Sequence, residues 1–135
     1  MRALLSILVF SMALWPAPGR GQSQLEMTTD ACADYEAADR ELNVVYQKVL
    51  DKYQKDALFI GKLKQAQRAW IAFRDAELAA IYPLEDKRTA YGSAHPMCQC
   101  TQLASLTRDR IQMLRTWLEA QEGDVCSGSR TPNSP

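Results

Sequence analysis

The sequence contains one histidine, no cluster of basic residues, and no alternation of polar and apolar residues long enough to suggest a β-strand. The missing alternation argues against a sheet. Without a basic cluster, nucleic acid and anionic membranes are poor partners. Catalysis by acid–base or nucleophilic chemistry needs suitably spaced side chains, and no such spacing is visible; the adjacent Glu85 and Asp86 lie in a charged, solvated stretch. We therefore expect neither an enzyme nor a bound cofactor.

The first 21 residues have the pattern of a signal peptide. A short basic start precedes an uncharged, mostly apolar run over residues 3–15, which is too short to span a membrane. We predict cleavage after Gly19 or Gly21, a periplasmic or secreted protein, and no stable membrane anchor, because no cysteine near the cleavage point could carry a lipid. Removal of residues 1–21 takes away two of the 16 basic residues and none of the 16 acidic ones, so the net charge becomes −2.

Three later stretches have apolar residues at the period of an α-helix. They cover about residues 28–53, 56–82 and 101–121. Thr28, Thr29 and Asp30 are good N-cap residues for the first, and Pro83 ends the second. Because only a short turn separates the first two helices, we expect them to be antiparallel neighbours.

These helices predict an all-α domain built as a small three-helix, up-down-up bundle. A long loop, residues 83–100, joins the second helix to the third. Loops of that length without regular structure are usually functional or tied down. The predicted segments are a signal peptide over residues 1–21, a short linker over 22–29, the helical domain over 30–126, and a disordered tail over 127–135.

Four cysteines follow the predicted signal peptide, namely Cys32, Cys98, Cys100 and Cys126. An even number in a small exported chain indicates two disulfides, with three possible pairings. The spacing His95-x-x-Cys98-x-Cys100 could also hold a metal, but an oxidising compartment and a single histidine favour disulfides, so we expect no metal. An up-down-up order places Cys32 near Cys98 or Cys100, which would pin the long loop, and the partner of Cys126 stays open.

Polar residues interrupt the apolar face of each predicted helix. They are Asp39 and Asn43 on the first, Gln67, Trp70 and Arg74 on the second, and Thr107 and Arg110 on the third. We interpret them as a polar layer between helices in which an arginine pairs with Asp39; a ligand site and simple exposure are the alternatives. In a buried layer, Asp39→Ala would cost roughly 3 kcal/mol or more, because it would leave a cation without its partner.

The same residues carry a resemblance to the lysozyme inhibitor LprI-like family. Its pattern is an acidic residue, Leu-Asn and Tyr on the first helix, Gln-x-x-Trp and an aromatic-Arg-Asp run on the second, and Thr-x-x-Arg-x-x-x-Leu on the third. The matching positions are Asp39, Leu42, Asn43 and Tyr46; Gln67, Trp70, Phe73, Arg74 and Asp75; Thr107, Arg110 and Leu114. The resemblance covers about residues 30–118. Leu78 and Gln102 stand where family members often have cysteines, so the family's disulfides are not carried over.

The resemblance implies a protein-binding domain that inhibits a lysozyme-type cell-wall hydrolase. The long loop is where we expect the contact, and Tyr91, Gly92, Ser93 and His95 are its candidate binding residues. A histidine or a hydroxyl could hydrogen-bond the carboxyl groups of a glycoside hydrolase. The alternatives are a plain surface loop, or a structural module of the cell envelope without inhibitory activity.

Overall fold

The computed structural model describes residues 23–119 and 125–130, and the predicted signal peptide lies outside them. The described residues form four α-helices, α1 (Gln24–Lys52), α2 (Ala57–Ile81), α3 (Lys87–Tyr91) and α4 (His95–Arg115), and a short 3₁₀ helix, η1 (Gly128–Arg130). No strand occurs in these residues. The all-α prediction is confirmed. None of the described helices is long and apolar enough to cross a membrane.

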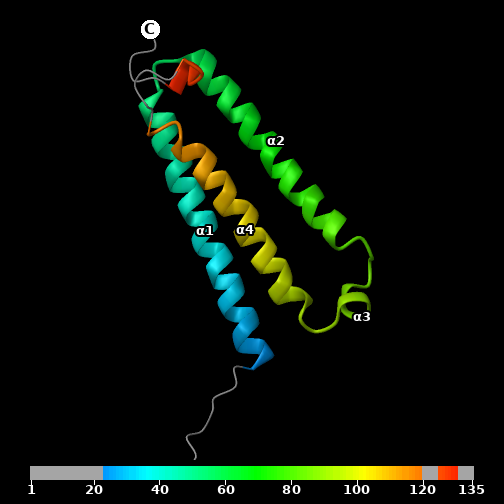
Figure 1. Cartoon of the computed structure of the whole chain (residues 1–135). Helices are drawn as coiled ribbons and strands as arrows, with labels where there is room; N and C mark the ends of the chain where they lie inside the picture. The colour runs from blue at the N-terminus through cyan, green and yellow to red at the C-terminus, as the bar shows by residue number, and fades with distance from the viewer. Residues whose placement is uncertain (1–22, 120–124, 131–135) are drawn as a thin grey trace, which may run out of the picture.

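The three long helices run up, down and up, but their packing differs from the predicted bundle. In Figure 1, α4 lies between α1 and α2. The main contact of the fold joins α1 to α4, and a smaller one joins α2 to α4. The expectation that α1 and α2 would be close neighbours is therefore wrong: the turn between them, residues 53–56, connects helices that make few contacts with each other.

Two of the helices begin earlier than predicted. Ser23 caps α1 in a capping box with Glu26, so most of the predicted linker 22–29 is the first part of this helix. Helix α4 begins at His95, with Pro96 in its first turn, where proline is well tolerated because the amide it lacks would have no intrahelical acceptor. The predicted loop 83–100 therefore contains α3 and the start of α4.

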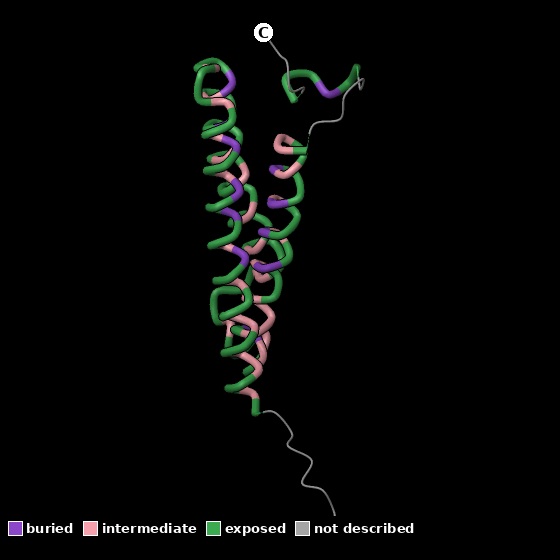
Figure 2. The backbone as a smooth tube through the Cα atoms, turned by 90° about the vertical axis from the view of Figure 1, so that its left-hand side faces the viewer, coloured by how far each residue is buried: buried purple, intermediate pink, exposed green. Residues whose placement is uncertain are grey.

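The hydrophobic core lies at the end of the molecule where α1 ends and α2 begins. Its buried members are Leu42, Val45, Val49, Phe59, Leu63, Ile111 and Leu114. Figure 2 shows that buried positions become sparse toward the opposite end. In α2 only Phe59 and Leu63 are buried, so most of this helix adds little to the core.

An aromatic cluster closes the core end. The ring centroids of Tyr53 and Phe59 are 4.3 Å apart, and the Trp117 ring lies 4.7 Å from that of Phe59. The Arg130 guanidinium lies 4.9 Å from the centre of the Trp117 ring, and Ser127 is buried. The first residues of the predicted disordered tail, 127–130, are therefore packed against the domain; residues 131–135 lie outside the described part.

A disulfide between Cys32 and Cys100 joins α1 to α4 at the other end. The second predicted disulfide is not formed, since Cys98 is a free thiol. Cys98 and Cys100 are two residues apart on one helix, so they point about 200° away from each other and only one can face α1. Cys126 is exposed and follows the C-terminal end of α4, the end opposite to the disulfide. Helix α4 is about 32 Å long.

Candidate functional site

The chain between α2 and α4 forms a compact corner, residues 82–96, which we call the α3 corner. Asp86 caps α3, and its carboxylate accepts a hydrogen bond from the Thr89 amide at 3.1 Å. Hydrogen bonds from Thr89 hold the pKa of Asp86 below its usual value. Gly92 ends the helix with a φ of +74°, a conformation that L side chains rarely adopt. Local hydrogen bonds thus give the corner a defined shape.

Three rings form the inner side of the α3 corner. The ring centroid of Tyr82 lies 5.2 Å from that of Tyr91 and 4.6 Å from that of His95, and Tyr91 stacks on His95 at 5.7 Å. The Tyr91 hydroxyl oxygen also accepts a hydrogen bond of 3.1 Å from the Leu84 amide. Burial, with smaller effects of Cys98 and Tyr91, raises the pKa of Tyr82. His95 is buried, and its Nε2 atom is inaccessible to solvent and has no hydrogen-bond partner among the described residues.

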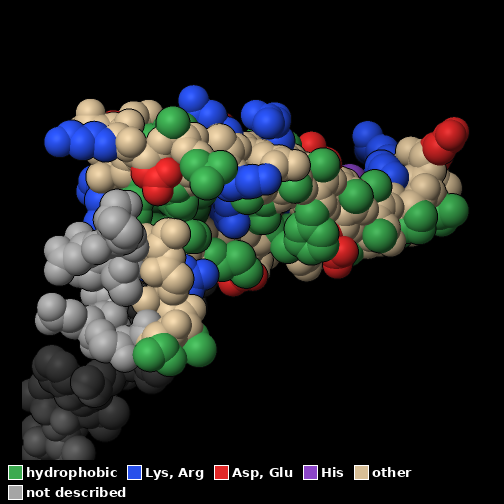
Figure 3. All heavy atoms as spheres, turned by 90° about the horizontal axis from the view of Figure 1, so that it is seen from above, with side chains coloured by type: hydrophobic (Ala, Val, Ile, Leu, Met, Phe, Trp, Pro, Cys, Tyr) green, Lys and Arg blue, Asp and Glu red, His purple; other side chains and the backbone are tan. Residues whose placement is uncertain are grey.

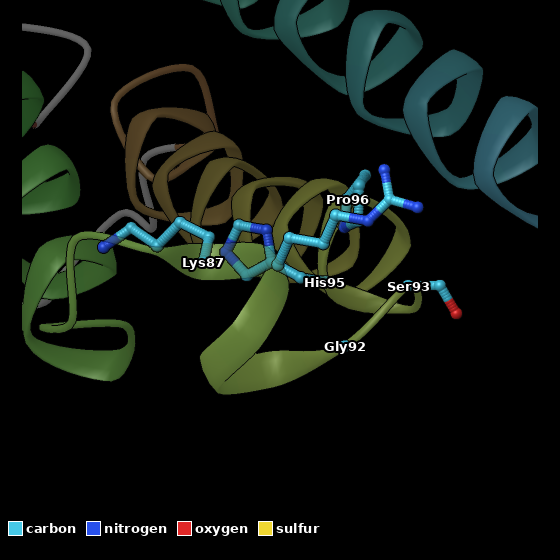
Figure 4. A pocket seen from close by; sticks show the side chains of 6 residues that line it. Lys87, Gly92, Ser93, His95 and Pro96 are labelled. Carbon is cyan, nitrogen blue, oxygen red and sulfur yellow. The ribbon is translucent and has the colours of Figure 1, made fainter.

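An open pocket of about 360 Å³ lies between α3 and the start of α4. It is lined by Lys87, Arg88, Gly92, Ser93, His95 and Pro96. In Figure 4 the Lys87 side chain extends away from Ser93, whose hydroxyl points outward from the rest of the group. The Lys87 ammonium donates to the Tyr82 carbonyl oxygen. Within residues 23–119 and 125–130, neither Lys87 nor Arg88 forms an ion pair with a carboxylate. The pocket therefore presents cationic side chains that have no carboxylate partner among those residues.

The four residues expected to bind a partner occupy different places in the corner. Ser93 is exposed, whereas His95 is buried and Tyr91 is half-buried inside the ring cluster; Gly92 shapes the turn. The structure thus brings all four together, but three of them, Tyr91, Gly92 and His95, help to build the corner.

The basic pair Lys87 and Arg88 is not among the residues predicted from the sequence, because it falls in the predicted loop over residues 83–100. A signal was present, since Asp86 is a good N-cap for a helix beginning at Lys87.

Part of the predicted polar layer forms between α2 and α4. The Arg110 Nε donates to the Gln67 side-chain oxygen at 3.0 Å. The guanidinium carbons of Arg74 and Arg110 lie 5.5 and 6.0 Å from the centre of the Trp70 ring. Burial lowers the pKa of Arg110, and Tyr46 opposes that shift. Arg74 pairs with its neighbour Asp75 at 2.7 Å. Gln67 therefore lies on the same face of α2 as Trp70, where its side chain bonds to an arginine on α4.

The predicted pairing of Asp39 with an arginine is wrong. Across the described residues, Asp39 contacts no guanidinium; one of its carboxylate oxygens accepts from Asn43 on the same helix at 3.4 Å. Asp39 lies on α1 and Arg74 on α2, and these two helices make few contacts with each other. Thr107 is fully buried, but its hydroxyl has no hydrogen-bond partner in the described part of the chain. Asp39, Asn43 and Thr107 thus do not join the contact around Trp70.

Exposed ion pairs join α1 to α4 instead. Arg108 pairs with Asp34, and Arg115 pairs with Glu41. Exposed pairs of this kind contribute at most about 1 kcal/mol each.

The candidate residues for a metal site do not come together. Cys100 is in the disulfide, so the His95-x-x-Cys98-x-Cys100 spacing cannot supply three ligands. Over residues 23–119 and 125–130, no group of three His, Cys, Asp or Glu side chains is placed to hold a metal ion. The chemistry that the α3 corner offers is binding through cations, hydrogen-bond donors and apolar surface.

Comparison with known proteins agrees with this description. An uncharacterised protein of Rhizobium meliloti (strain 1021) is 38% identical over 113 residues, which cover 74% of this chain and 77% of that protein. No solved structure matches. The model of the family described as lysozyme inhibitor LprI matches residues 16–114. The family predicted from Asp39, Gln67, Trp70, Arg110 and their neighbours is confirmed: the chain belongs to the lysozyme inhibitor LprI family.

Proposed function

We propose that this protein is exported and inhibits a lysozyme-type cell-wall hydrolase by inserting its α3 corner into the substrate cleft. The observation that carries the proposal is the family match over residues 16–114, which names lysozyme inhibition as the family's activity. The α3 corner is the part of the chain that best suits a contact with a concave partner. In Figure 1 it stands out to one side of the α1–α4 pair.

The corner is ordered before it meets a partner. Asp86 caps α3, the rings of Tyr82, Tyr91 and His95 pack together, and the disulfide at Cys100 fixes the start of α4 to α1. A contact surface that is already ordered loses little conformational entropy on binding, which favours affinity.

The surface of the corner is chemically suited to the cleft of a glycoside hydrolase. Such clefts carry a pair of carboxyl groups that act as acid and as base or nucleophile. Lys87 and Arg88 offer complementary charge, and Leu84 of the same corner is 58% exposed. Figure 3 shows basic, acidic and hydrophobic side chains together at the end of the molecule that carries α3.

Export is the second part of the proposal. It is supported by the signal-peptide pattern of residues 1–21 and by the Cys32–Cys100 disulfide, because disulfides persist in oxidising compartments such as the periplasm. Cell-wall hydrolases act in the same compartment. Fractionation of the cells that make the protein, with a periplasmic and a cytoplasmic marker, tests this part; recovery in the cytoplasm would contradict it.

The inhibition assay measures the rate at which lysozyme clears a suspension of cell walls. We expect the wild-type protein to stop clearing at close to one inhibitor per enzyme, for an animal-type or a phage-type lysozyme. Ser93→Tyr adds bulk at the exposed tip and should weaken inhibition by about tenfold or more, equivalent to 1.4 kcal/mol. Ser105→Tyr is the matched control, because Ser105 is exposed on α4 outside the pocket. Its inhibition should equal that of wild type.

Full clearing in the presence of excess protein, for both classes of lysozyme, would refute the proposal. An envelope module of the alternative kind would leave clearing unchanged and sediment with envelope material. Equal inhibition by Ser93→Tyr and wild type would show that the protein is an inhibitor but that it does not contact lysozyme through the α3 corner.

A further inference from the structure

We propose that α2 forms an antiparallel pair with α2 of a second copy of this chain, through the side of the helix that faces away from α4. The inference concerns the assembly of the protein and does not depend on the proposed function. Two features carry it. Hydrophobic side chains of α2 are left uncovered, and the charges of the helix are complemented by the same helix running in the opposite direction.

Helix α2 is the least buried of the three long helices. It has 25 residues, so it is about 38 Å long, yet only Phe59 and Leu63 are buried. Its substantial contact with another described helix is with α4, and Figure 1 shows it on the side of α4 away from α1. Leu58 is 75% exposed and Phe73 is 53% exposed. Side chains of this size gain free energy when a neighbouring helix covers them.

The side of α2 that faces away from α4 carries short side chains. Successive residues of a helix are turned by 100°, which places Ala72 and Ala76 on the opposite side from the core residue Leu63. Both alanines are exposed. The distance between two packed helix axes depends on the side chains at the contact, so a second helix can approach this side closely.

The exposed charged residues of α2 are segregated along the helix. Lys62, Lys64 and Arg68 lie in its first half, and Asp75 and Glu77 lie in its second half. The helix dipole gives no reason for this order, since it favours the reverse. Lys64 and Arg68 also repel each other, because they are four residues apart on one helix. Among the described residues, Asp75 is the one of these five that forms an ion pair, with its neighbour on the helix.

A second copy that runs antiparallel complements this order. Lys62 and Lys64 are two residues apart, and so are Asp75 and Glu77, so a single register brings both basic residues opposite acidic ones. In that register Lys62 lies opposite Glu77 of the second copy, and Lys64 lies opposite Asp75 of the second copy. The two pairs follow opposite edges of the outward side, because Lys62 and Lys64 are turned by about 200° from each other. Two-fold symmetry makes each pair occur twice.

The same register covers exposed hydrophobic surface. Phe73 lies on the same edge of α2 as Lys62 and opposite Ala66 of the second copy, so the second helix would cover its ring. Charged residues at the edges of a helix pair set its partner and its orientation. The two α3 corners then lie at opposite ends of the pair, since each corner follows the C-terminal end of its own α2.

The first experiment measures the mass of the purified chain by sedimentation equilibrium from micromolar to millimolar concentrations. We expect a monomer that becomes a dimer as the concentration rises, and a weaker dimer at high salt, which screens exposed charges. Lys62→Glu should weaken the dimer about tenfold or more, and so should Glu77→Lys, because each variant places like charges opposite each other. An equal mixture of the two variants should dimerise as well as the wild type does, since every opposed pair in the mixed dimer is attractive.

Lys48→Glu is the matched control, because Lys48 is exposed on α1 and lies outside the proposed contact. Its dimer should be as strong as that of the wild type, and the helical circular dichroism signal of all the variants should be unchanged. A monomer at every concentration would overturn the inference. A dimer that Lys62→Glu does not weaken would also overturn it, as would a mixture that dimerises no better than either variant alone.

The second experiment tests the register by cross-linking in a Cys98→Ser/Cys126→Ser background, which keeps the Cys32–Cys100 disulfide. We expect Ala69→Cys to form a disulfide-linked dimer on mild oxidation, because residue 69 of each copy lies next to the centre of the pair.

Ala76→Cys is the matched control for the cross-link, since Ala76 is an exposed alanine of the same helix. The two copies of residue 76 would lie about 20 Å apart along the helix axes, too far for a disulfide, so this variant should stay unlinked. Equal cross-linking of Ala69→Cys and Ala76→Cys would indicate a parallel pair, and cross-linking of neither would place the contact elsewhere. Either result would overturn the antiparallel pairing.

Discussion

Breaking the Cys32–Cys100 disulfide is expected to destabilise the domain strongly. The two cysteines are 68 residues apart in the sequence, and the bond joins the helices that form the main packing contact. In the loop-closure model, a closed loop of that length lowers the entropy of the unfolded chain by about 15 cal/mol/K, which is about 4 kcal/mol at 25 °C. Measured values usually fall between about 2 and 4 kcal/mol. The end of the molecule that carries this bond has few buried residues, so little hydrophobic packing there can replace it.

The assay is urea unfolding followed by the helical circular dichroism signal. The double variant Cys32→Ser/Cys100→Ser should lose about 2–4 kcal/mol of unfolding free energy relative to the oxidised wild type. For a domain of this size, that loss lowers the melting temperature by roughly 10 °C or more. Cys98→Ser is the control, because Cys98 forms no disulfide, and it should cost less than about 1 kcal/mol. A loss below about 1 kcal/mol in the double variant would refute the reasoning and show that the α1–α4 contacts alone hold the ends together.

Two further changes test the packing described above. Asp39→Ala should cost less than about 1 kcal/mol, and not the larger value expected for a buried ion pair, because among the described residues the Asp39 side chain bonds only to Asn43 on the same helix; a loss near 3 kcal/mol in urea unfolding would contradict this and support a buried pair. Leu114→Ala should cost about 2–5 kcal/mol, since Leu114 is fully buried. Met113→Ala, at a position 58% exposed on the same helix, should cost less than about 0.5 kcal/mol, and equal losses for both would contradict the core assignment.

The helices were predictable because their apolar residues repeat at the helical period. Which helices pack against each other was not predictable. Periodicity identifies the face that a helix buries, and it does not say which other helix covers that face. The short turn between α1 and α2 suggested that they pack together, yet α4 lies between them. The early start of α1 carried a signal in Ser23 and Glu26, a capping box that outweighs the later Thr28.

The candidate site was predictable in part, for a similar reason. Cys32 and its two possible partners followed from the order of the helices, and the choice of Cys100 depended on the rotation of α4, which the sequence does not state. Gln67 was expected to face Asp39 or Asn43 on the first helix, and its partner is instead Arg110 on α4. The sequence did not predict the cationic pocket, because α3 has five residues, too few to show a period, and because Pro96 falls in the predicted loop, whereas in the structure it lies in the first turn of α4.

The dominance of the α1–α4 contact has a consequence for how the molecule acquires its structure. As the chain emerges from its N-terminal end, α1 is complete long before α4 exists, and α2 cannot cover its apolar face in the meantime. Native contacts must therefore form between segments separated by more than sixty residues, a high contact order for a helical protein, which predicts slower folding than in bundles of sequential neighbours. Until then, α1 is the segment most exposed to proteases and to aggregation.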